Sequence, residues 1–229
     1  MSALITQVLF KPSKVVRRIN SFRGAIISTV GNHISLFHNH DGDALVYAYP
    51  LIQYKKTDGL LSIVGINEGA EIIDDLWKVG MNFELTIDGE PVTLEVYSKQ
   101  SYSFEAQISD RPMQTYILTN WLPFNKENYL RYKDTDLLAD RISMLERLLI
   151  GNILSLLKGL DHWVEEQILV NISEIIKSST LKYKGIELVS FDVKFKTNIT
   201  LPLQCGIGKG SSKGFGVITN PHLARTTTF

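Results

Sequence analysis

The order of predicted strands and helices indicates an α+β fold made of two tandem ferredoxin-like (RRM-like) domains. Over roughly the first 100 residues, apolar strand patterns and amphipathic helical patterns follow the β-α-β-β-α-β order. A similar succession starts again near residue 115, after a polar stretch at 109–112. We therefore expect one domain over residues 1–109 and a second over residues 110–229.

In the first half, strands are expected at 3–10, 45–55, 60–66 and 83–87, with an extra C-terminal hairpin strand at 92–97. Ser13 is a suitable N-cap for a first helix, whose apolar residues Val15, Val16, Ile19, Phe22 and Ile26 recur at helical spacing. Asn67 is expected to cap a second helix that ends at Gly80. The turn at 57–59 joins the first hairpin.

In the second half, residues 115–121 are expected to form a strand, and 137–157 a strongly amphipathic helix. Residues 168–176 fit a helix or a strand. A hairpin is expected over 180–183 and 187–196, followed by a last strand at 215–219. The second unit is therefore expected to be ferredoxin-like with an imperfect second helix.

Composition limits the possible classes of protein. The chain has 229 residues, of which 44% are hydrophobic and 21% charged, as expected for a globular protein. With Cys205 as its single cysteine, it has neither a disulfide framework nor a cysteine-based metal site. The N-terminal residues lack a secretory pattern, and no apolar run approaches the ~18 residues of a membrane span. We expect a cytoplasmic protein with no membrane contact.

Charge is unevenly distributed along the chain, although the net charge is zero. Residues 11–23 carry +5, from Lys11, Lys14, Arg17, Arg18 and Arg23, with no acid. Residues 177–229 carry +6, so the rest of the chain carries −11. This segregation favours one basic face that can follow phosphates.

A glycine-rich loop at 206–216 holds five glycines in eleven residues. Such a backbone can approach another surface closely, and its amides suit phosphate oxygens, with Lys209 and Lys213 adding positive charge. The spacing fits neither the P-loop nor the dinucleotide-binding pattern, so no nucleotide cofactor is expected. The alternative is a tight connection between strands that binds no ligand.

A histidine segment at 31–54 places His33, His38 and His40 within eight residues, next to Asp41 and Asp43. Three interpretations are open: a solvent-exposed polar loop, a metal site of His and Asp ligands, or acid–base catalysis. Metal-free RNA cleavage needs a base for the 2′-hydroxyl proton and an acid for the leaving 5′-oxygen. Two imidazoles can supply both, with a tyrosine to position the substrate and a lysine to stabilise charge.

Both segments resemble a known family. The arrangement Gly206-Ile207-Gly208, five residues, then Gly214-Phe215-Gly216 resembles the C-terminal signature of the repeat-associated RNA-binding superfamily of CRISPR systems. The stretch from Arg23-Gly24 through 36–40 to 49–55 is similar to the N-terminal domain of the CRISPR-associated endoribonucleases of the Cas-six type, b subtype.

The resemblance implies a metal-independent endoribonuclease, without cofactor, that cuts CRISPR repeat RNA into guide RNAs. It assigns catalysis to His38, His40 and Tyr47, with His33 as a weaker candidate and Lys55 as a guess for the lysine that some relatives use. RNA binding is expected at the following residues: Gly206, Gly208, Lys209, Lys213, Gly214, Phe215, Gly216, Arg17 and Arg18. The expected partners are repeat RNA and, beyond it, a CRISPR effector complex, for a monomer or a homodimer.

Two alternatives remain at this point. A non-catalytic CRISPR RNA-binding subunit of an effector complex fits the glycine-rich loop equally well, but it leaves the histidines unexplained. A metal-dependent hydrolase would use His33, His38, His40 and Asp41 as ligands, and chelation would abolish its activity.

Overall fold

The structure is a computed structural model that describes residues 2–30, 35–37, 40–41, 44–45, 49–111, 114–183 and 186–221. The chain forms two compact units. The first contains Met1–Phe104 together with Gly159–Asp161 and Ser212–Gly214, and the second contains the remaining residues. Among the described residues, no helix has the length and apolar character required to cross a membrane.

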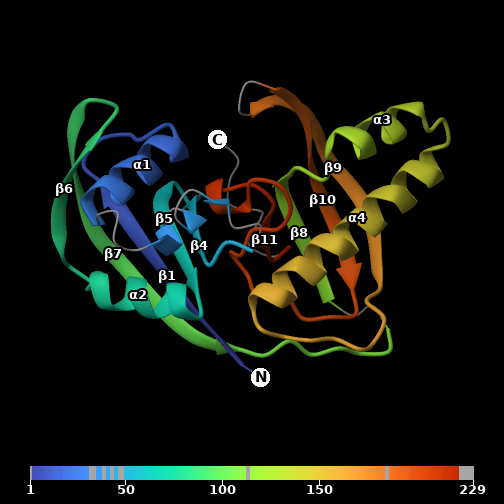
Figure 1. Cartoon of the computed structure of the whole chain (residues 1–229), viewed down its shortest axis with the longest axis horizontal. Helices are drawn as coiled ribbons and strands as arrows, with labels where there is room; N and C mark the ends of the chain where they lie inside the picture. The colour runs from blue at the N-terminus through green and yellow to red at the C-terminus, as the bar shows by residue number, and fades with distance from the viewer. Residues whose placement is uncertain are drawn as a thin grey trace. The chain divides into compact units, whose positions relative to one another are not determined.

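The first unit is a five-stranded antiparallel sheet covered by two helices (Figure 1). The sheet follows the order β4-β5-β1-β7-β6. Its strands are β1 (Ala3–Pro12), β4 (Ile52–Thr57), β5 (Leu60–Ile66), β6 (Asn82–Ile87) and β7 (Glu90–Phe104). Helices α1 (Ile19–Val30) and α2 (Glu68–Leu76) contribute to one hydrophobic core with the sheet, so both cover the same face. Order and layering are those of a ferredoxin-like unit with one added strand.

The added strand is β6 and not the strand expected at 92–97. In the structure β7 takes the place beside β1, and β6 lies at the edge of the sheet. The reason is length, since β7 pairs with β1 from Ala3–Phe104 to Pro12–Leu94. The Asp88-Gly89 turn then folds β6 onto the outside, with φ angles of 53° and 84° that are typical of a type I′ hairpin.

The core of the first unit is built around aromatic side chains. Phe10 of β1 is fully buried, and its ring meets Phe22, Trp77 and Phe83 edge-on at centroid distances of 5.9, 5.3 and 5.9 Å. Such edge-to-face pairs add about 0.5–1.5 kcal/mol each beyond their burial. Because Phe22 lies on α1 and Trp77 follows α2, this cluster fixes both helices against the sheet.

Helix α1 begins later than its apolar pattern indicates. The expected start at Ser13 is wrong, because Ser13 extends the sheet contacts of β1 instead of capping a helix. Its backbone N–H donates to Thr93 O at 2.8 Å, and its hydroxyl oxygen accepts from Thr93 N at 3.0 Å. The helix starts at Ile19, and Val15 remains 86% exposed.

The second unit has a four-stranded antiparallel sheet in the order β11-β8-β10-β9 (Figure 1). Its strands are β8 (Gln114–Trp121), β9 (Val170–Tyr183), β10 (Ile186–Thr197) and β11 (Val217–Thr219). The ambiguous residues 168–176 therefore belong mainly to a strand. The glycine-rich loop stands where the second helix of a ferredoxin-like unit is expected, and its 3-10 turn η2 (Ser211–Lys213) is mostly counted with the first unit. The predicted α+β fold with two ferredoxin-like units is confirmed.

The long helix α4 (Leu138–Gly159) supplies the core of the second unit. Its buried stripe consists of Met144, Leu145, Leu149, Ile153, Leu156 and Leu157. A helix that the sequence did not predict, α3 (Lys126–Asp134), precedes it and buries none of its residues. Its N-cap is Asn125, whose side-chain oxygen accepts from Asn128 N at 2.7 Å.

Candidate RNA-cleavage segment and glycine-rich loop

The histidine segment is described only in part. It contains the turn η1 (Ser35–Phe37) and the short strands β2 (His40–Asp41) and β3 (Ala44–Leu45), which pair with each other, with His40 opposite Leu45. His38, Tyr47 and the weaker candidate His33 lie outside the described residues, as does the side chain of His40. The catalytic assignments therefore remain predictions.

Two glycines of the glycine-rich loop, Gly208 and Gly216, are packed closely within the second unit. Gly216 has φ 62°, and a β-carbon there would collide with the carbonyl oxygen of Ile207. Gly208 has φ 81°, and its β-carbon would lie 2.9 Å from both Asn152 Oδ1 and Trp121 Nε1. Trp121 Nε1 donates to Asn152 Oδ1 at 2.8 Å, so this glycine covers an existing hydrogen bond. Packing alone therefore requires glycine at both positions.

Several amides of the loop donate within the protein. Ile207 N donates to Gly216 O at 2.8 Å, Lys209 N to Leu122 O at 3.3 Å, Phe215 N to Gly210 O at 3.4 Å and Gly216 N to Asn120 O at 3.2 Å. These four donors are not available to a phosphate. The interpretation of the whole loop as an open set of amides is therefore too broad, and the side chains have the larger role in any RNA contact.

The predicted RNA-binding side chains of the loop differ in exposure. Lys209 is exposed, whereas Lys213 and Phe215 are half-buried. The Phe215 ring meets Tyr183, at the end of β9, edge-on at a centroid distance of 5.5 Å. Aromatic rings beside a lysine can stack on unpaired bases. Tyr183 was not predicted as a site residue, because the contact joins positions 32 apart in the sequence.

Arg17 and Arg18 lie between β1 and α1, and both are exposed. Arg18 forms an ion pair with Asp88 while its side chain stays 70% exposed. Ser21 Oγ donates to the same carboxylate at 2.6 Å, and the serine hydroxyl and Arg18 together hold the pKa of Asp88 below its usual value. Part of the charge of Arg18 is therefore already balanced by Asp88.

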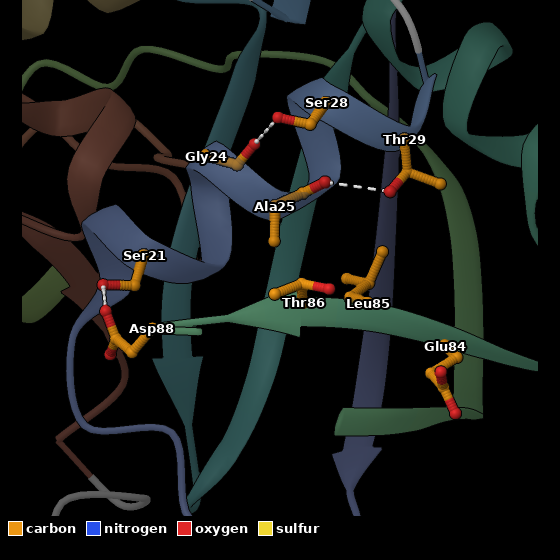
Figure 2. A pocket seen from close by; sticks show the side chains of 9 residues that line it. All are labelled: Ser21, Gly24, Ala25, Ser28, Thr29, Glu84, Leu85, Thr86 and Asp88. Carbon is orange, nitrogen blue, oxygen red and sulfur yellow. Dashed lines mark hydrogen bonds between the residues drawn. The ribbon is translucent and has the colours of Figure 1, made fainter. Parts of the chain in front are cut away.

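A pocket of about 450 Å³ lies between α1 and the edge strand β6 of the first unit (Figure 2). It is lined by Ser21, Gly24, Ala25, Ser28, Thr29, Glu84, Leu85, Thr86 and Asp88. Figure 2 shows Ser28 and Thr29 turned back to the helix, where their hydroxyls donate to Gly24 O and Ala25 O at 3.0 Å each. Its ionisable lining groups, Glu84 and Asp88, are both acidic, which disfavours phosphate. We do not assign RNA to this pocket.

Comparison with known proteins identifies the family. The N-terminal domain family of Cas6b matches residues 1–102, and its C-terminal domain family matches residues 107–221. The chain belongs to the Cas6b family. A solved Cas6b crystal structure superposes with a TM-score of 0.81 at 28% identity, covering 96% of this chain and 100% of that one.

Two further proteins are similar to this Cas6b chain. A solved CRISPR RNA processing endoribonuclease Cas6b has a TM-score of 0.69 at 25% identity, covering 96% of this chain and 99% of that one. An uncharacterised protein of Methanocaldococcus jannaschii is 34% identical over 136 residues, 59% of this chain and 90% of that protein. The predicted family is thus confirmed. In the described part of this Cas6b chain, no cluster of three or more His, Cys, Asp or Glu side chains has metal-binding geometry.

Proposed function

We propose that this Cas6b chain is an endoribonuclease that cuts CRISPR repeat RNA without a metal ion. The observation that carries the proposal is the match of both Cas6b domain families, in order, over residues 1–102 and 107–221. One solved structure of the family is described as a CRISPR RNA processing endoribonuclease, and its fold covers 96% of this chain.

The proposed reaction is an intramolecular transesterification. A base takes the proton of the 2′-hydroxyl, and the 2′-oxygen then forms a bond to the adjacent phosphorus. The bond from phosphorus to the 5′-oxygen breaks, and an acid protonates the leaving oxygen. The products are a 2′,3′-cyclic phosphate and a 5′-hydroxyl end. His38 and His40 share the two proton transfers, because imidazole titrates near neutral pH, and Tyr47 orients the substrate.

RNA is held in this proposal by cationic and aromatic side chains. Lys209 and Lys213 contact backbone phosphates, and Phe215 with its neighbour Tyr183 offers an aromatic surface to unpaired bases. Arg17 adds a phosphate contact from the first unit, and Arg18 a weaker one because of its pairing with Asp88. The glycines of the loop contribute by allowing it to pack against the protein, which places these side chains for the RNA.

The proposal is tested with a labelled repeat RNA in EDTA, beside the same RNA carrying a 2′-deoxy nucleotide at the cut site. One discrete cut, abolished by the deoxy substitution, is the expected result. Loss of cleavage on chelation would instead favour the metal-dependent hydrolase. Binding without any cut would make the chain a guide-holding subunit and remove the catalytic roles.

Alanine variants of the histidines test whether His38 and His40 are the catalytic residues. His38→Ala and His40→Ala are each expected to lower the single-turnover rate by roughly 100-fold or more, the usual contribution of a general acid or base. His162→Ala is the matched control, since it removes the same side chain outside the segment. Full activity of both His38→Ala and His40→Ala would refute the assignment.

A further inference from the structure

The residues on either side of the 38–48 stretch both accept hydrogen bonds that are at least partly buried. Phe37 precedes the stretch and Tyr49 follows it, and both belong to the first unit. Each contact involves a side chain of α1 or β4 that the proposed reaction does not use. The following inference rests on the proposed function, because it concerns how the candidate catalytic stretch is held.

At the first end, Arg23 of α1 holds the backbone of Phe37. Arg23 Nη2 donates to Phe37 O at 3.3 Å, and the guanidinium carbon lies 5.8 Å from the ring centroid of Tyr54 in β4. The Phe37 side chain is 2% exposed and contacts the Trp77 ring edge-on at 6.2 Å. Side chain and carbonyl of the residue before His38 are therefore both fixed by the core.

At the second end, Gln53 of β4 holds Tyr49. Gln53 Nε2 donates to Tyr49 Oη at 2.8 Å and to Pro50 O at 3.2 Å. Lys55 Nζ donates to Gln53 Oε1 at 3.0 Å, which fixes the orientation of the amide. Gln53 and Lys55 are 0% and 1% exposed, so these hydrogen bonds are shielded from water.

Three successive residues of β4 thus serve both ends. Tyr54 faces the hydrophobic core, and Gln53 and Lys55 point to the opposite side, since side chains alternate along a strand. A buried amide and a buried lysine are costly choices for an edge strand, where apolar residues would fold as well. Their placement is explained by a role in fixing Tyr49 and Pro50, where the chain approaches β4 after the 38–48 stretch.

We propose that Arg23 and Gln53 are positioning residues for RNA cleavage, which fix the two ends of the 38–48 stretch without touching the RNA. Proton transfer requires the reacting groups to be held within a fraction of an ångström of the productive geometry, and rigid support outside the reacting groups supplies this precision. Loosening either end lowers the rate of the chemical step and leaves RNA affinity unchanged.

The test uses four variants: Tyr49→Phe, Gln53→Leu, the double variant of these two, and Arg23→Met. Tyr49→Phe removes only a hydroxyl, and Arg23→Met keeps most of the packed stem of the arginine side chain. Each single variant is expected to lower the single-turnover cleavage rate at saturating protein by about tenfold, with the RNA Kd unchanged. The double variant should be no slower than Gln53→Leu, because both substitutions break the same hydrogen bond.

Ser62→Ala is the matched control. It removes a partly buried hydrogen bond of 3.1 Å from Gln7 Nε2 to Ser62 Oγ in the same sheet, at the β5 residue that pairs with Lys55, and leaves in place the hydrogen bonds that hold Phe37 and Tyr49. Ser62→Ala is expected to lower Tm about as much as the variants at the two ends do, but to leave the cleavage rate unchanged. If Ser62→Ala slowed cleavage as much as the other variants, the effect would be one of stability, and the proposal would be overturned. A raised Kd in Arg23→Met would make Arg23 an RNA contact instead.

Hydrogen exchange gives a readout that needs no activity. Faster exchange in peptides containing Phe37 or Tyr49 is expected in the variants at the corresponding end, but not in Ser62→Ala. Unchanged exchange would overturn the proposal even if the rates fell. If the wild-type protein cut no repeat RNA, the proposed function would fail, and the contacts would have no catalytic role. Faster exchange in the variants would still show that these contacts hold the two ends of the stretch.

Discussion

The ring of Tyr49 lies directly against the α-carbon of Gly159, the last residue of α4. A β-carbon on this glycine would come within 2.7 Å of Tyr49 Cγ and 2.8 Å of Tyr49 Cβ. Atoms near the base of a side chain cannot move aside by a simple rotation, so the close approach depends on glycine. Gly159 belongs to the same compact unit as Tyr49, although most of α4 does not.

Gly159→Ala is therefore expected to destabilise the protein by about 1–3 kcal/mol through overpacking. The control is Gly151→Ala on the same helix, where a β-carbon would meet nothing within 4 Å. That variant should gain up to about 1 kcal/mol, because alanine favours a helix interior over glycine. Thermal unfolding of both variants measures the difference. Equal stability of the two would mean that Tyr49 is not held where the structure places it.

Gly216→Ala is expected to be among the most damaging substitutions in the glycine-rich loop. It combines a φ of 62° with a collision against the Ile207 carbonyl, for a cost of about 3 kcal/mol or more. Gly80→Ala also has a positive φ, 84°, but open space around it, so it should cost only about 1–2 kcal/mol. Denaturant midpoints of the two variants separate steric collision from backbone strain. A Gly216 variant as stable as the Gly80 variant would contradict the close packing of the loop.

The fold class could be predicted from patterns that act over short distances along the chain. The bounds of individual elements were predicted wrongly where pairing between distant residues determines them. The start of α1 is an example, because the apolar spacing of Val15 and Val16 favoured a helix. Residue 13 instead extends the sheet contacts of β1, because two hydrogen bonds join Ser13 to Thr93, 80 positions away in the sequence. No local signal in the sequence reports such a partner.

Helix α3 was missed for a different reason. A surface helix is recognised by an apolar stripe, and α3 buries none of its residues. Its N-cap Asn125 and its aromatic neighbours hold it in place, with Tyr132 lying 4.8 Å from Phe124 and 6.0 Å from Phe191 between ring centroids. Phe191 belongs to β10, so its contact with Tyr132 forms only when β10 and α3 are brought together in the folded protein.

The candidate site shows the same limit. Glycine spacing and clustered histidines were visible as patterns, and they pointed to the family that the domain matches confirm. The sequence offered no reason to connect Phe215 with Tyr183, or Arg23 with Phe37, because these contacts are made by the packing of separate elements. Supporting residues are harder to predict than reacting ones for this reason.

Tyr54→Phe is expected to raise stability at neutral pH by about 1 kcal/mol. The Tyr54 hydroxyl is buried and finds no hydrogen-bond partner in the described part of the chain, so the folded state carries its desolvation cost. The ring contacts with Phe22 and Arg23 are kept in phenylalanine. Urea unfolding at pH 7 measures the change, and a clear loss of stability would show that the hydroxyl has a partner.

Alkaline pH should widen this difference. Burial raises the pKa of Tyr54, although the nearby Arg23 opposes the shift. Above the unfolded value of about 10, the folded state then holds a proton that the unfolded chain has lost, so stability falls as pH rises. Tyr54→Phe lacks this contribution. Its advantage over the wild-type protein is therefore expected to be larger at pH 10.5 than at pH 7, and a constant difference would contradict the raised pKa.

Lys209→Gln is expected to weaken RNA binding in a salt-dependent way. Lys209 is exposed, and its backbone amide is already bonded to Leu122 O, so the ammonium group is the part that can reach a phosphate. One lost phosphate contact reduces the slope of log Kd against log salt concentration by about one. Lys78→Gln, an exposed lysine of the first unit that follows α2, is the control and should leave the slope unchanged. Titrations of repeat RNA at several salt concentrations measure both slopes. If the two variants changed the slope equally, RNA attraction would come from cations spread over the surface and not from the glycine-rich loop. The phosphate contacts proposed for Lys213 and Arg17 would then be refuted as well.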